Sequence, residues 1–376
     1  MTKGRDRVVE LRNQLMSHAI ATDAQFAGRF VGSLQQPHVQ SVGPVASLCL
    51  VSYLSLFAHE SYQRLKASQP ALAESVSSDT SAIIKRSRHS LKLFEDTERR
   101  LTGQLAYFRD EIIDAHKARF LGKTWFWPAR FLETDLGLYL YDGIPISSTH
   151  AATLALGFEP QALLDKGGST LVRDTFTECG RYFALLGATV DGHAVSFASS
   201  FDHTRLKAKD VRSTRYYTRI FNGASTPEIN ALLDVFRVSM NFVNSVLPVD
   251  STLDSYQTIF KIQFLTLYQV IRSLDILRQQ RRNQLSTASI DAIRSIVDTV
   301  ESRILTDGQA RPFRNTLMHY GPDTRIDLTA ADLQAPLYGL VNICFPDHDN
   351  ASLDTLLTDH IARTARILND WALLVG

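Results

Sequence analysis

The sequence predicts a mainly α-helical protein, with an antiparallel helical bundle at the C-terminal end, a helical N-terminal region and a mixed, irregular middle region. In the first and last thirds of the 376-residue chain, apolar residues recur at three- and four-residue steps, as on amphipathic helices. The middle third is richer in glycine and aromatic residues. The hydrophobic content of 44% supports a sizeable core, and the charged content of 21% indicates neither disorder nor a coiled-coil rod. We expect three regions, 1–121, 122–225 and 226–376.

The N-terminal region is expected to form helices. Apolar spacing predicts a first helix over Arg5–Ile20. The segment Val45–Leu65 is apolar on most sides, which is typical of a central, buried helix. From Thr80 to about Phe120 apolar residues continue at helical spacing among many charges, which predicts a long amphipathic helix.

The middle region carries turn signals at Gly167-Gly168 and Asp191-Gly192. Leu138–Leu140 and Ala194–Phe197 could form short strands, and Phe176–Leu186 is expected to be helical. No overall architecture follows from these signals.

The C-terminal region returns to helical spacing at Thr226, a good N-cap residue followed by Pro227. Four long helices are expected, with a short one opened by Pro312 between the third and the fourth. They cover 226–247, 251–280, 286–304 and 352–374. Such helices bury their apolar stripes as an antiparallel bundle.

Net charge and cysteine content limit the binding partners and the cellular compartment that we expect. A formal net charge of +1 gives no global attraction to nucleic acid or to an anionic membrane. Three widely separated cysteines exclude a disulfide framework and favour a reducing compartment. The longest apolar stretch, Val45–Ala58, is too short to span a bilayer, and residues 1–14 do not resemble a signal peptide. We therefore expect a cytoplasmic protein with no membrane partner.

The most informative stretch is Arg314-Asn315-x-x-x-His319, which follows Pro312 near a helix start. Free backbone N–H groups at a helix start favour a phosphate. Arg314 and His319 are five residues apart, so a regular helix points them about 140° apart. Either the turn is irregular, or two copies combine across a dimer axis into one composite site.

These residue types suit RNA cleavage without a metal. Histidine titrates near neutrality and can act as base or acid towards a 2′-hydroxyl. Arginine stays charged and can hold phosphate oxygens, while Asn315 can donate to phosphate or orient His319. No carboxylate or Cys/His cluster has convincing ligand spacing, so neither a metal nor a cofactor is predicted.

The motif, placed after the third long helix, resembles the signature of the HEPN superfamily, an Arg followed by a polar residue and, four to six residues after the Arg, a His. The resemblance covers the C-terminal third only. It implies a helical bundle that forms homodimers, with Arg314 and His319 as the catalytic pair and Asn315 as an auxiliary group. It also implies a metal-independent endoribonuclease leaving 2′,3′-cyclic phosphate ends. Many such proteins act as toxins paired with an antitoxin, in abortive infection or in other antiviral defence.

Two other interpretations stay open. The bundle could bind RNA, a nucleotide or a partner protein without cleaving anything. The triplet could also be accidental, with Arg314 paired to an acidic surface neighbour and His319 capping the end of its helix near Gly321.

A basic segment, 203–219, holds six Lys or Arg and one Asp together with two tyrosines. Cations with aromatic rings suit single-stranded RNA, and a solvated loop or helix face is the alternative. The residues expected to contact RNA are Arg205, Lys207, Lys209, Arg212, Arg215, Tyr216, Tyr217 and Arg219.

Two further features have competing explanations. Lys117, Arg119 and Lys123 precede Trp125 and Trp127, which could form an RNA surface or pack in a core or interface. The cluster 347–349, Asp-His-Asp, resembles a metal site, but capping of the last helix is the better explanation.

Overall fold

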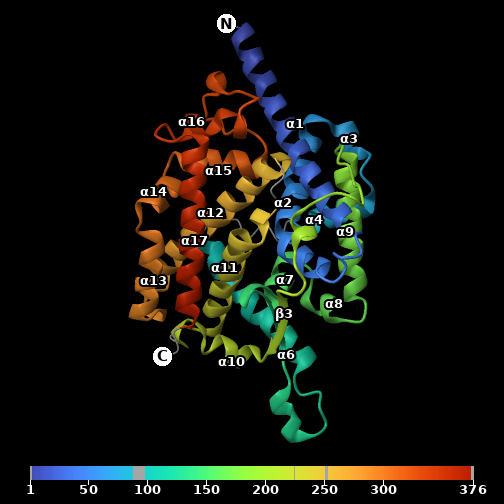
Figure 1. Ribbon diagram of the computed structural model, residues 1–376, viewed down its shortest axis with the longest axis vertical. Coiled ribbons are helices and arrows are strands. Elements are labelled where there is room, and N and C mark those ends of the chain that lie inside the picture. The colour runs from blue at the N-terminus through green and yellow to red at the C-terminus, as the bar shows by residue number, and fades with distance from the viewer. Residues whose placement is uncertain (1, 88–97, 224, 250–252, 374–376) are drawn as a thin grey trace.

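The structure, a computed structural model, describes residues 2–87, 98–223, 225–249 and 253–373. It is mainly helical with one small three-stranded sheet, which confirms the predicted fold class in outline. Figure 1 shows α12 (Tyr256–Gln280) near the centre, with α17 (Asn350–Leu373) and α2 (Gly43–Ser68) packed on either side. A HEPN-like arrangement of the C-terminal helices stays a prediction.

The first helix is longer than predicted, and the predicted helix from Thr80 to Phe120 is divided into shorter ones. The first helix, α1, covers Thr2–Ser33, and the predicted central helix is α2, most of whose residues from Val45 to Ala58 are buried. The predicted helix from Thr80 to Phe120 lies partly outside the described residues. Within them the chain forms α3 (Pro70–Glu74), α4 (Ser78–Ser87), α5 (Glu98–Tyr107), a π-helical turn (Phe108–Ile113) and α6 (Asp114–Phe120).

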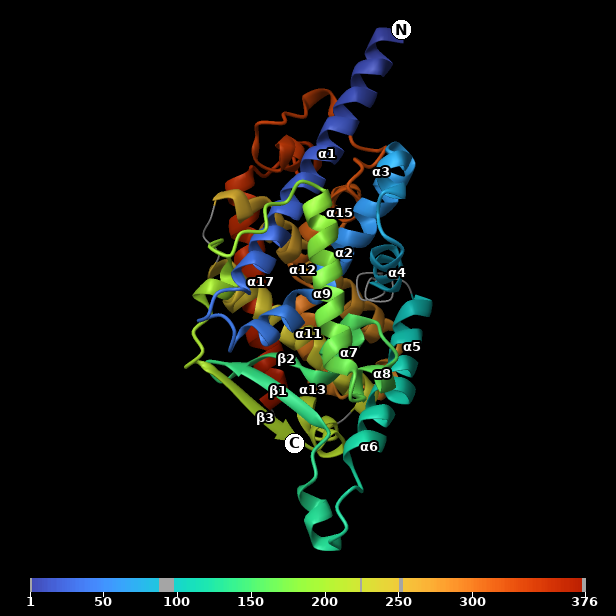
Figure 2. The same cartoon turned by 90° about the vertical axis from the view of Figure 1, so that its right-hand side faces the viewer.

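The middle region contains the sheet. Strand β1 (Leu136–Tyr141) pairs antiparallel with β2 (Ile144–Ser148) on one side and β3 (Leu206–Val211) on the other. Asp142 and Gly143 join the first two strands with φ of 52° and 80°, the pattern of a tight two-residue hairpin turn. Figure 2 shows the sheet at the lower side of the molecule.

One predicted strand is wrong. Ala194–Phe197 does not pair with the sheet. Instead the Oγ of Ser196 accepts a hydrogen bond of 3.2 Å from the backbone N–H of Ala198 and caps a short 3₁₀ helix, Phe197–Ser200. A local side-chain bond of this kind competes with strand pairing. The predicted helix Phe176–Leu186 lies almost wholly within α9 (Gly168–Leu185), which follows α7 (Thr149–Leu156) and α8 (Pro160–Leu164).

The long C-terminal helices match the prediction except that one of them is divided, and the short α16 (Leu340–Cys344) was not predicted. The helices of this region are α11 (Pro227–Ser245), α12, α13 (Thr287–Val297), α14 (Val300–Thr306), α15 (Ala310–His319), α16 and α17, after a short α10 (Ser213–Tyr217). The expected single helix 286–304 is two helices. The Oγ1 of Thr299 accepts a 3.1 Å hydrogen bond from the N–H of Ser302, and this cap starts a new helix.

One hydrophobic core extends from Leu15 in α1 to Ala372 in α17. The N-terminal helices contact the C-terminal ones directly, as in the 2.7 Å hydrogen bond between the hydroxyls of Tyr53 and Thr266. The three cysteines are free and buried, as expected of small apolar groups.

Helix α11 is the one described segment that passes a length and composition test for a membrane span, over Pro227–Val249. Of its most apolar window, 72% is buried inside the structure, so we interpret α11 as a core helix. A cytoplasmic location stays a prediction.

Two buried histidines make stability depend on pH. Burial lowers the pKa of His116 and of His360 from 6.5 to about 4. At a pH between about 4 and 6.5, these histidines bind protons in the unfolded chain but not in the folded chain. The free energy of unfolding therefore falls as the pH falls from 6.5 towards 4. Each histidine contributes at most about 1.4 kcal/mol per pH unit.

Urea unfolding of the wild type and of His360→Gln over this window measures the effect. The glutamine is expected to retain a hydrogen bond to Ser302 Oγ, which His360 Nε2 makes at 2.7 Å, and to flatten the pH dependence. An unchanged slope in the variant would contradict the assignment.

Candidate functional site

The motif lies on α15, which is regular from Ala310 to His319 and ends where Tyr320 adopts a left-handed conformation. A regular helix rules out the irregular turn considered above, so Arg314 and His319 point to different neighbours. The helix start is also occupied, because Asp307 Oδ1 accepts hydrogen bonds from the N–H groups of Gln309 and Ala310.

His319 forms a pair with a carboxylate of a distant helix. Its Nδ1 lies 2.8 Å from Glu60 Oε2 on α2, and its side chain is 40% exposed, whereas that of Glu60 is 13% exposed. A carboxylate only accepts, so Nδ1 carries the hydrogen and Nε2 holds the lone pair in the neutral ring. Among the described residues Nε2 has no hydrogen-bond partner. This arrangement suits a general base.

Helix α2 holds the end of α15 through a second residue. Arg64, one turn beyond Glu60, donates from Nε to the backbone oxygen of His319 at 2.6 Å. This bond satisfies a carbonyl that the helix itself leaves unpaired. A Cβ at Gly321 would lie 2.8 Å from the Arg64 guanidinium carbon, so a larger residue there would displace the end of the Arg64 side chain.

The arginine of the motif is less accessible than the histidine. Arg314 is 8% exposed, its guanidinium carbon lies 5.5 Å from the centre of the Tyr268 ring, and its Nη1 donates to Asn315 Oδ1 at 3.2 Å. Asn315 Nδ2 donates to Asp323 at 3.1 Å, and hydrogen bonds from Arg325 lower the pKa of that carboxyl. Asn315 therefore contacts Arg314 rather than orienting His319.

If the Arg314–His319 motif were accidental, His319 was expected to cap the end of its own helix. Its imidazole instead bonds Glu60 on another helix, and Arg64 provides the cap. The bond to Glu60 uses only Nδ1, so Nε2 of the imidazole is available for other chemistry.

The basic segment 203–219 forms the edge strand β3 and the short α10. Lys207, Lys209, Arg215 and Arg219 are exposed. Arg212 is half-buried. These exposed cations could meet an anionic partner, although lysines also protect a sheet edge from pairing with other chains.

Other members of this segment are engaged within the chain. Arg205 pairs with Asp142 and lies over the Tyr141 ring. Tyr217 is 1% exposed with its hydroxyl 3.1 Å from His150 Nδ1, and the hydroxyl of Tyr216 donates to Asp234. In this conformation the Tyr217 ring is not available to stack on a base.

The structure does not bring the basic segment and the motif together. In Figures 1 and 2, which share the vertical axis, α15 lies in the upper half of the molecule and β3 in the lower half. Within one chain the cations of 205–219 and His319 therefore lie on different parts of the molecule.

The Asp-His-Asp cluster is a helix cap, as predicted. Asp349 Oδ1 accepts from the N–H of Ser352 at 2.8 Å, which starts α17. Within the described residues no group of three His, Cys, Asp or Glu side chains could hold a metal ion.

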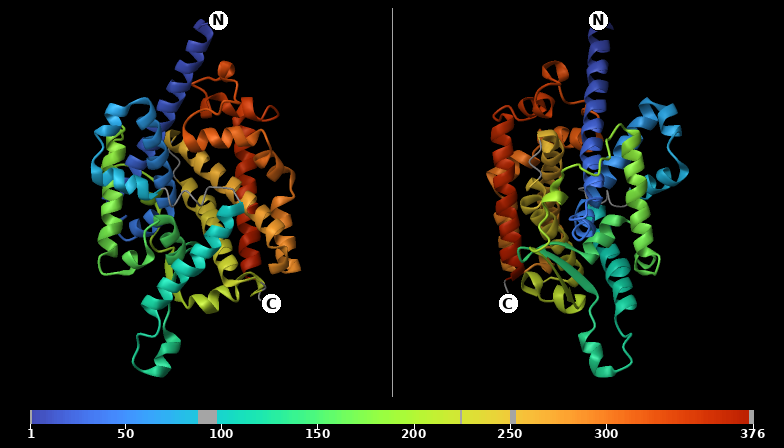
Figure 3. Two further views of the ribbon diagram at one scale, coloured as in Figure 1. Left: turned by 180° about the vertical axis from the view of Figure 1, so that it is seen from behind. Right: turned by 45° about the vertical axis from the view of Figure 1, so that its right-hand side comes forward.

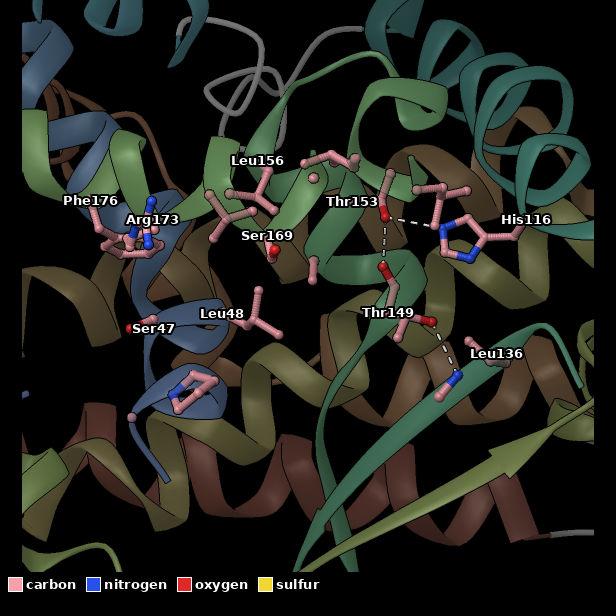
Figure 4. Close-up of a pocket in the computed structure, with 18 of the residues that line it drawn as sticks. Ser47, Leu48, His116, Leu136, Thr149, Thr153, Leu156, Ser169, Arg173 and Phe176 are labelled. Atoms are coloured by element: carbon pink, nitrogen blue, oxygen red, sulfur yellow. Dashed lines mark hydrogen bonds between the residues drawn. The ribbon is translucent and has the colours of Figure 1, made fainter. Parts of the chain in front are cut away.

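A cavity of about 930 Å³, shown in Figure 4, lies between α1, α2, α6, β1 and α7–α9. Its wall is mostly apolar, and its volume is typical of small-molecule sites. The apolar side chains include Val31, Leu34, Leu48, Phe120, Leu136, Leu156, Leu163, Leu164, Val172 and Phe176.

Some of the polar groups in the cavity wall are bonded to one another. Thr149 Oγ1 accepts from the N–H of Gly137 at 3.0 Å, and Thr153 Oγ1 lies 3.1 Å from His116 Nε2. Arg173 lies at one side near Phe176 in Figure 4. The cavity therefore suits a molecule with a large apolar part better than it suits acid–base chemistry.

Sequence reasoning missed the residues that hold the motif. Glu60, Arg64 and Tyr268 lie far from it in the chain and bear no local pattern that points to it. The four-residue spacing of Glu60 and Arg64 was a weak signal, because it reads equally well as an ion pair within one helix. Helix α2 both lines the cavity, at Ser47 and Leu48, and contacts the motif.

The chain matches no family model, no characterised protein and no solved structure in the three comparisons.

Proposed function

We propose that the protein is a metal-independent endoribonuclease of HEPN type that acts as a homodimer. The observation that carries this proposal is the half-exposed imidazole of His319, whose Nδ1 bonds Glu60 and whose Nε2 has no partner among the described residues. A histidine held by a carboxylate in this way is ready to exchange a proton at its other nitrogen.

The proposed reaction is an internal transesterification of RNA. His319 Nε2 removes the proton of a 2′-hydroxyl, and the resulting oxygen attacks the adjacent phosphorus. The bond from phosphorus to the 5′-oxygen breaks, and a protonated histidine returns a proton to that oxygen. The products are a 2′,3′-cyclic phosphate and a 5′-hydroxyl. Arg314 stabilises the extra negative charge on the phosphate oxygens.

A second copy of the chain would complete the site. Because α15 is regular, one copy directs Arg314 towards Tyr268 on α12 and His319 towards Glu60 on α2. Two α15 helices across a twofold axis would supply two histidines, one as base and one as acid, and two arginines. The exposed face of His319 is the part that can meet the partner.

We extend the proposal to a cytoplasmic role in antiviral defence or as a toxin restrained by a regulatory protein or antitoxin. The support is the resemblance of the Arg314–His319 motif, together with the large region before residue 226 that packs on the same core. An unregulated ribonuclease would harm its host, so such a region could control it.

The burial of Arg314 favours the second candidate, a non-catalytic bundle that binds RNA, a nucleotide or a protein. An arginine that is 8% exposed and packed on Tyr268 can be structural. Incubating the purified protein with total RNA in the presence of EDTA separates the two. Cleavage with cyclic phosphate ends supports the nuclease, whereas binding without cleavage supports the second candidate.

Glu60 is expected to be a positioning residue. The Glu60→Gln variant removes the negative acceptor that holds Nδ1–H, so we expect kcat to fall by about tenfold or more with KM unchanged. Glu74→Gln, which alters an exposed carboxylate on α3, is the matched control and should leave both constants unchanged. Equal rates for Glu60→Gln and wild type would show that the pair is only structural.

A further inference from the structure

Between α6 and β1 the chain leaves the body of the protein as a projecting loop, residues 121–134, which we call the finger. Figures 1 and 2 show it beyond the sheet, at the end of the molecule opposite the start of α1, and Figure 3 shows it continuing the direction of α6. A short 3₁₀ helix, Trp127–Leu132, forms its tip.

The finger exposes large apolar side chains that proteins normally bury. Trp125 is 89% exposed, Leu132 is 81% exposed, and Trp127 and Phe131 are each 67% exposed. The alternative that these tryptophans pack in the core of one chain is therefore wrong. Exposed apolar residues that are contiguous rather than scattered mark a surface that binds a protein, a ligand or a membrane.

The finger is an ordered structure. The Glu133 carboxylate accepts hydrogen bonds from the N–H groups of Thr124, at 2.7 Å, and Gly122, at 2.5 Å, which lower the pKa of Glu133 to about 2. Arg130 Nε donates to the Thr124 oxygen at 2.8 Å. These bonds join the two sides of the loop at its root. Ordering before binding reduces the entropy lost on docking.

Exposed cations lie close in the chain to the apolar residues of the finger. Arg119, Lys123 and Arg130 are exposed, and Glu133 is the only carboxylate in 119–133, so this stretch has three positive charges against one negative. The Glu133 carboxylate is hydrogen-bonded to the backbone N–H groups of Gly122 and Thr124. The finger therefore combines an apolar tip with a positive root, although the whole chain has a net charge of only +1.

The strand register adds further cations at the same end. Leu136, just after the finger, pairs with Val211, and Leu138 pairs with Lys209. The exposed Lys209 of β3 therefore lies near the root of the finger, together with the exposed Asp210, which pairs with Gly137. Lys207 pairs with Leu140, farther along the strand, and the exposed Arg215 follows on α10.

We propose that the finger and these cations form a docking surface for an anionic lipid bilayer. Trp125, Trp127, Phe131 and Leu132 enter the headgroup layer, and the lysines and arginines at the root meet lipid phosphates. Tryptophan favours this interface because its ring is apolar and its N–H needs a polar partner. Neither the apolar tip nor the positive charge alone binds firmly, and the combination does.

The shape favours a bilayer over RNA or a protein. Rings that stack on bases usually lie in a groove that tracks the backbone, whereas these side chains project from a narrow convex tip. The tip rings also contact one another, Trp127 and Phe131 at 5.4 Å between centres, and Leu132 offers no ring. The inference does not depend on the ribonuclease proposal, and it differs from the expectation, drawn from the sequence, that the protein has no membrane partner.

Sedimentation with vesicles tests the inference on the full-length protein. We expect wild type to pellet with mixed phosphatidylcholine and phosphatidylglycerol vesicles, and to release from them as salt rises. Binding to pure phosphatidylcholine vesicles should be weaker. The variants Trp125→Ser/Trp127→Ser and Phe131→Ser/Leu132→Ser should each weaken binding by about tenfold or more, since each buried side chain contributes that much.

Tryptophan fluorescence provides an independent readout. Two of the three tryptophans are in the finger, and the third, Trp371, is 1% exposed in the core. We expect a blue shift on mixing with anionic vesicles that Trp125→Ser/Trp127→Ser abolishes, while the Trp371 emission and the thermal transition remain. The matched controls Val195→Ser and Val300→Ser change valines that are 55% and 65% exposed elsewhere, and should bind as wild type does.

Four outcomes would overturn the inference. In the first, wild type stays in the supernatant with anionic vesicles, and in the second, the finger variants pellet as well as the controls. The blue shift could appear with a single-stranded RNA instead of vesicles, which would assign the finger to nucleic acid. It could also appear on raising the protein concentration, with a doubled mass by light scattering, which would assign the finger to a second copy of the chain.

Discussion

Replacing His319 by alanine is expected to lower the rate of RNA cleavage by about a hundredfold to ten-thousandfold, the range that one general acid or base contributes. The imidazole is half-exposed, its Nε2 has no partner in the part of the chain that the structure describes, and the proposed reaction uses it in both proton transfers. Cleavage of a defined RNA in EDTA, followed by detection of the cyclic phosphate end, measures the loss.

Arg314→Ala is expected to cause a loss of similar size, because the guanidinium would carry the charge that develops on phosphate. Arg311→Ala is the matched control, since it removes an exposed arginine of the same helix. Arg314 is 8% exposed, so its variant is also compared with wild type by thermal unfolding. Full activity in a folded His319→Ala protein would refute the proposed mechanism.

Mixing the two inactive variants tests the composite site. A mixed dimer of Arg314→Ala and His319→Ala retains one arginine and one histidine, on different chains. If the site is built across the dimer, this pairing keeps one base and one arginine but lacks the second histidine that acts as acid. Such mixtures should therefore recover only a small part of the activity, above that of either variant alone. If each chain held a complete site of its own, the mixture would stay as inactive as its components, because neither chain has both residues.

Asp23→Ala is expected to destabilise the protein by about 3–5 kcal/mol, the cost of leaving a buried charge without its partner. Asp23 is 3% exposed and Lys261 is 5% exposed, with 2.5 Å between Oδ2 and Nζ. Thr258 and Tyr320 also donate to the Asp23 carboxylate, at 2.7 and 2.6 Å. Burial lowers the pKa of Lys261, while Asp23 opposes that shift.

Urea unfolding measures this effect, and two further variants interpret it. Asp23→Ala/Lys261→Met removes both charges and should recover much of the loss. Asp254→Ala breaks the 3.5 Å pair with Arg29, in which the aspartate is 85% exposed, and should cost less than about 1 kcal/mol. Equal losses for Asp23→Ala and Asp254→Ala would contradict the importance of the buried network. Because Tyr320 follows His319 directly, Asp23→Ala should lower activity as well.

The helices of this protein could largely be predicted because apolar periodicity and capping residues are local properties. The predicted segment 45–65 is α2, and Ser352–Leu374 coincides with most of α17. The short helix that carries the motif ends before Gly321, as predicted, but begins at Ala310, two residues before the predicted start at Pro312. The prediction was wrong where two local signals compete. The continuous apolar stripe predicted one helix over 286–304, but the Thr299 hydroxyl caps a second helix within it.

The sequence by itself determined the mainly helical fold, the buried cysteines, the cap at Asp349 and the position of Arg314 and His319 on one short helix. Only the tertiary structure decided that Glu60 holds His319, that Arg314 packs on Tyr268, and that Trp125 and Trp127 project from the surface. Helix formation depends on neighbours within a few residues, whereas Glu60 and His319 are separated by 259 residues and meet through packing alone.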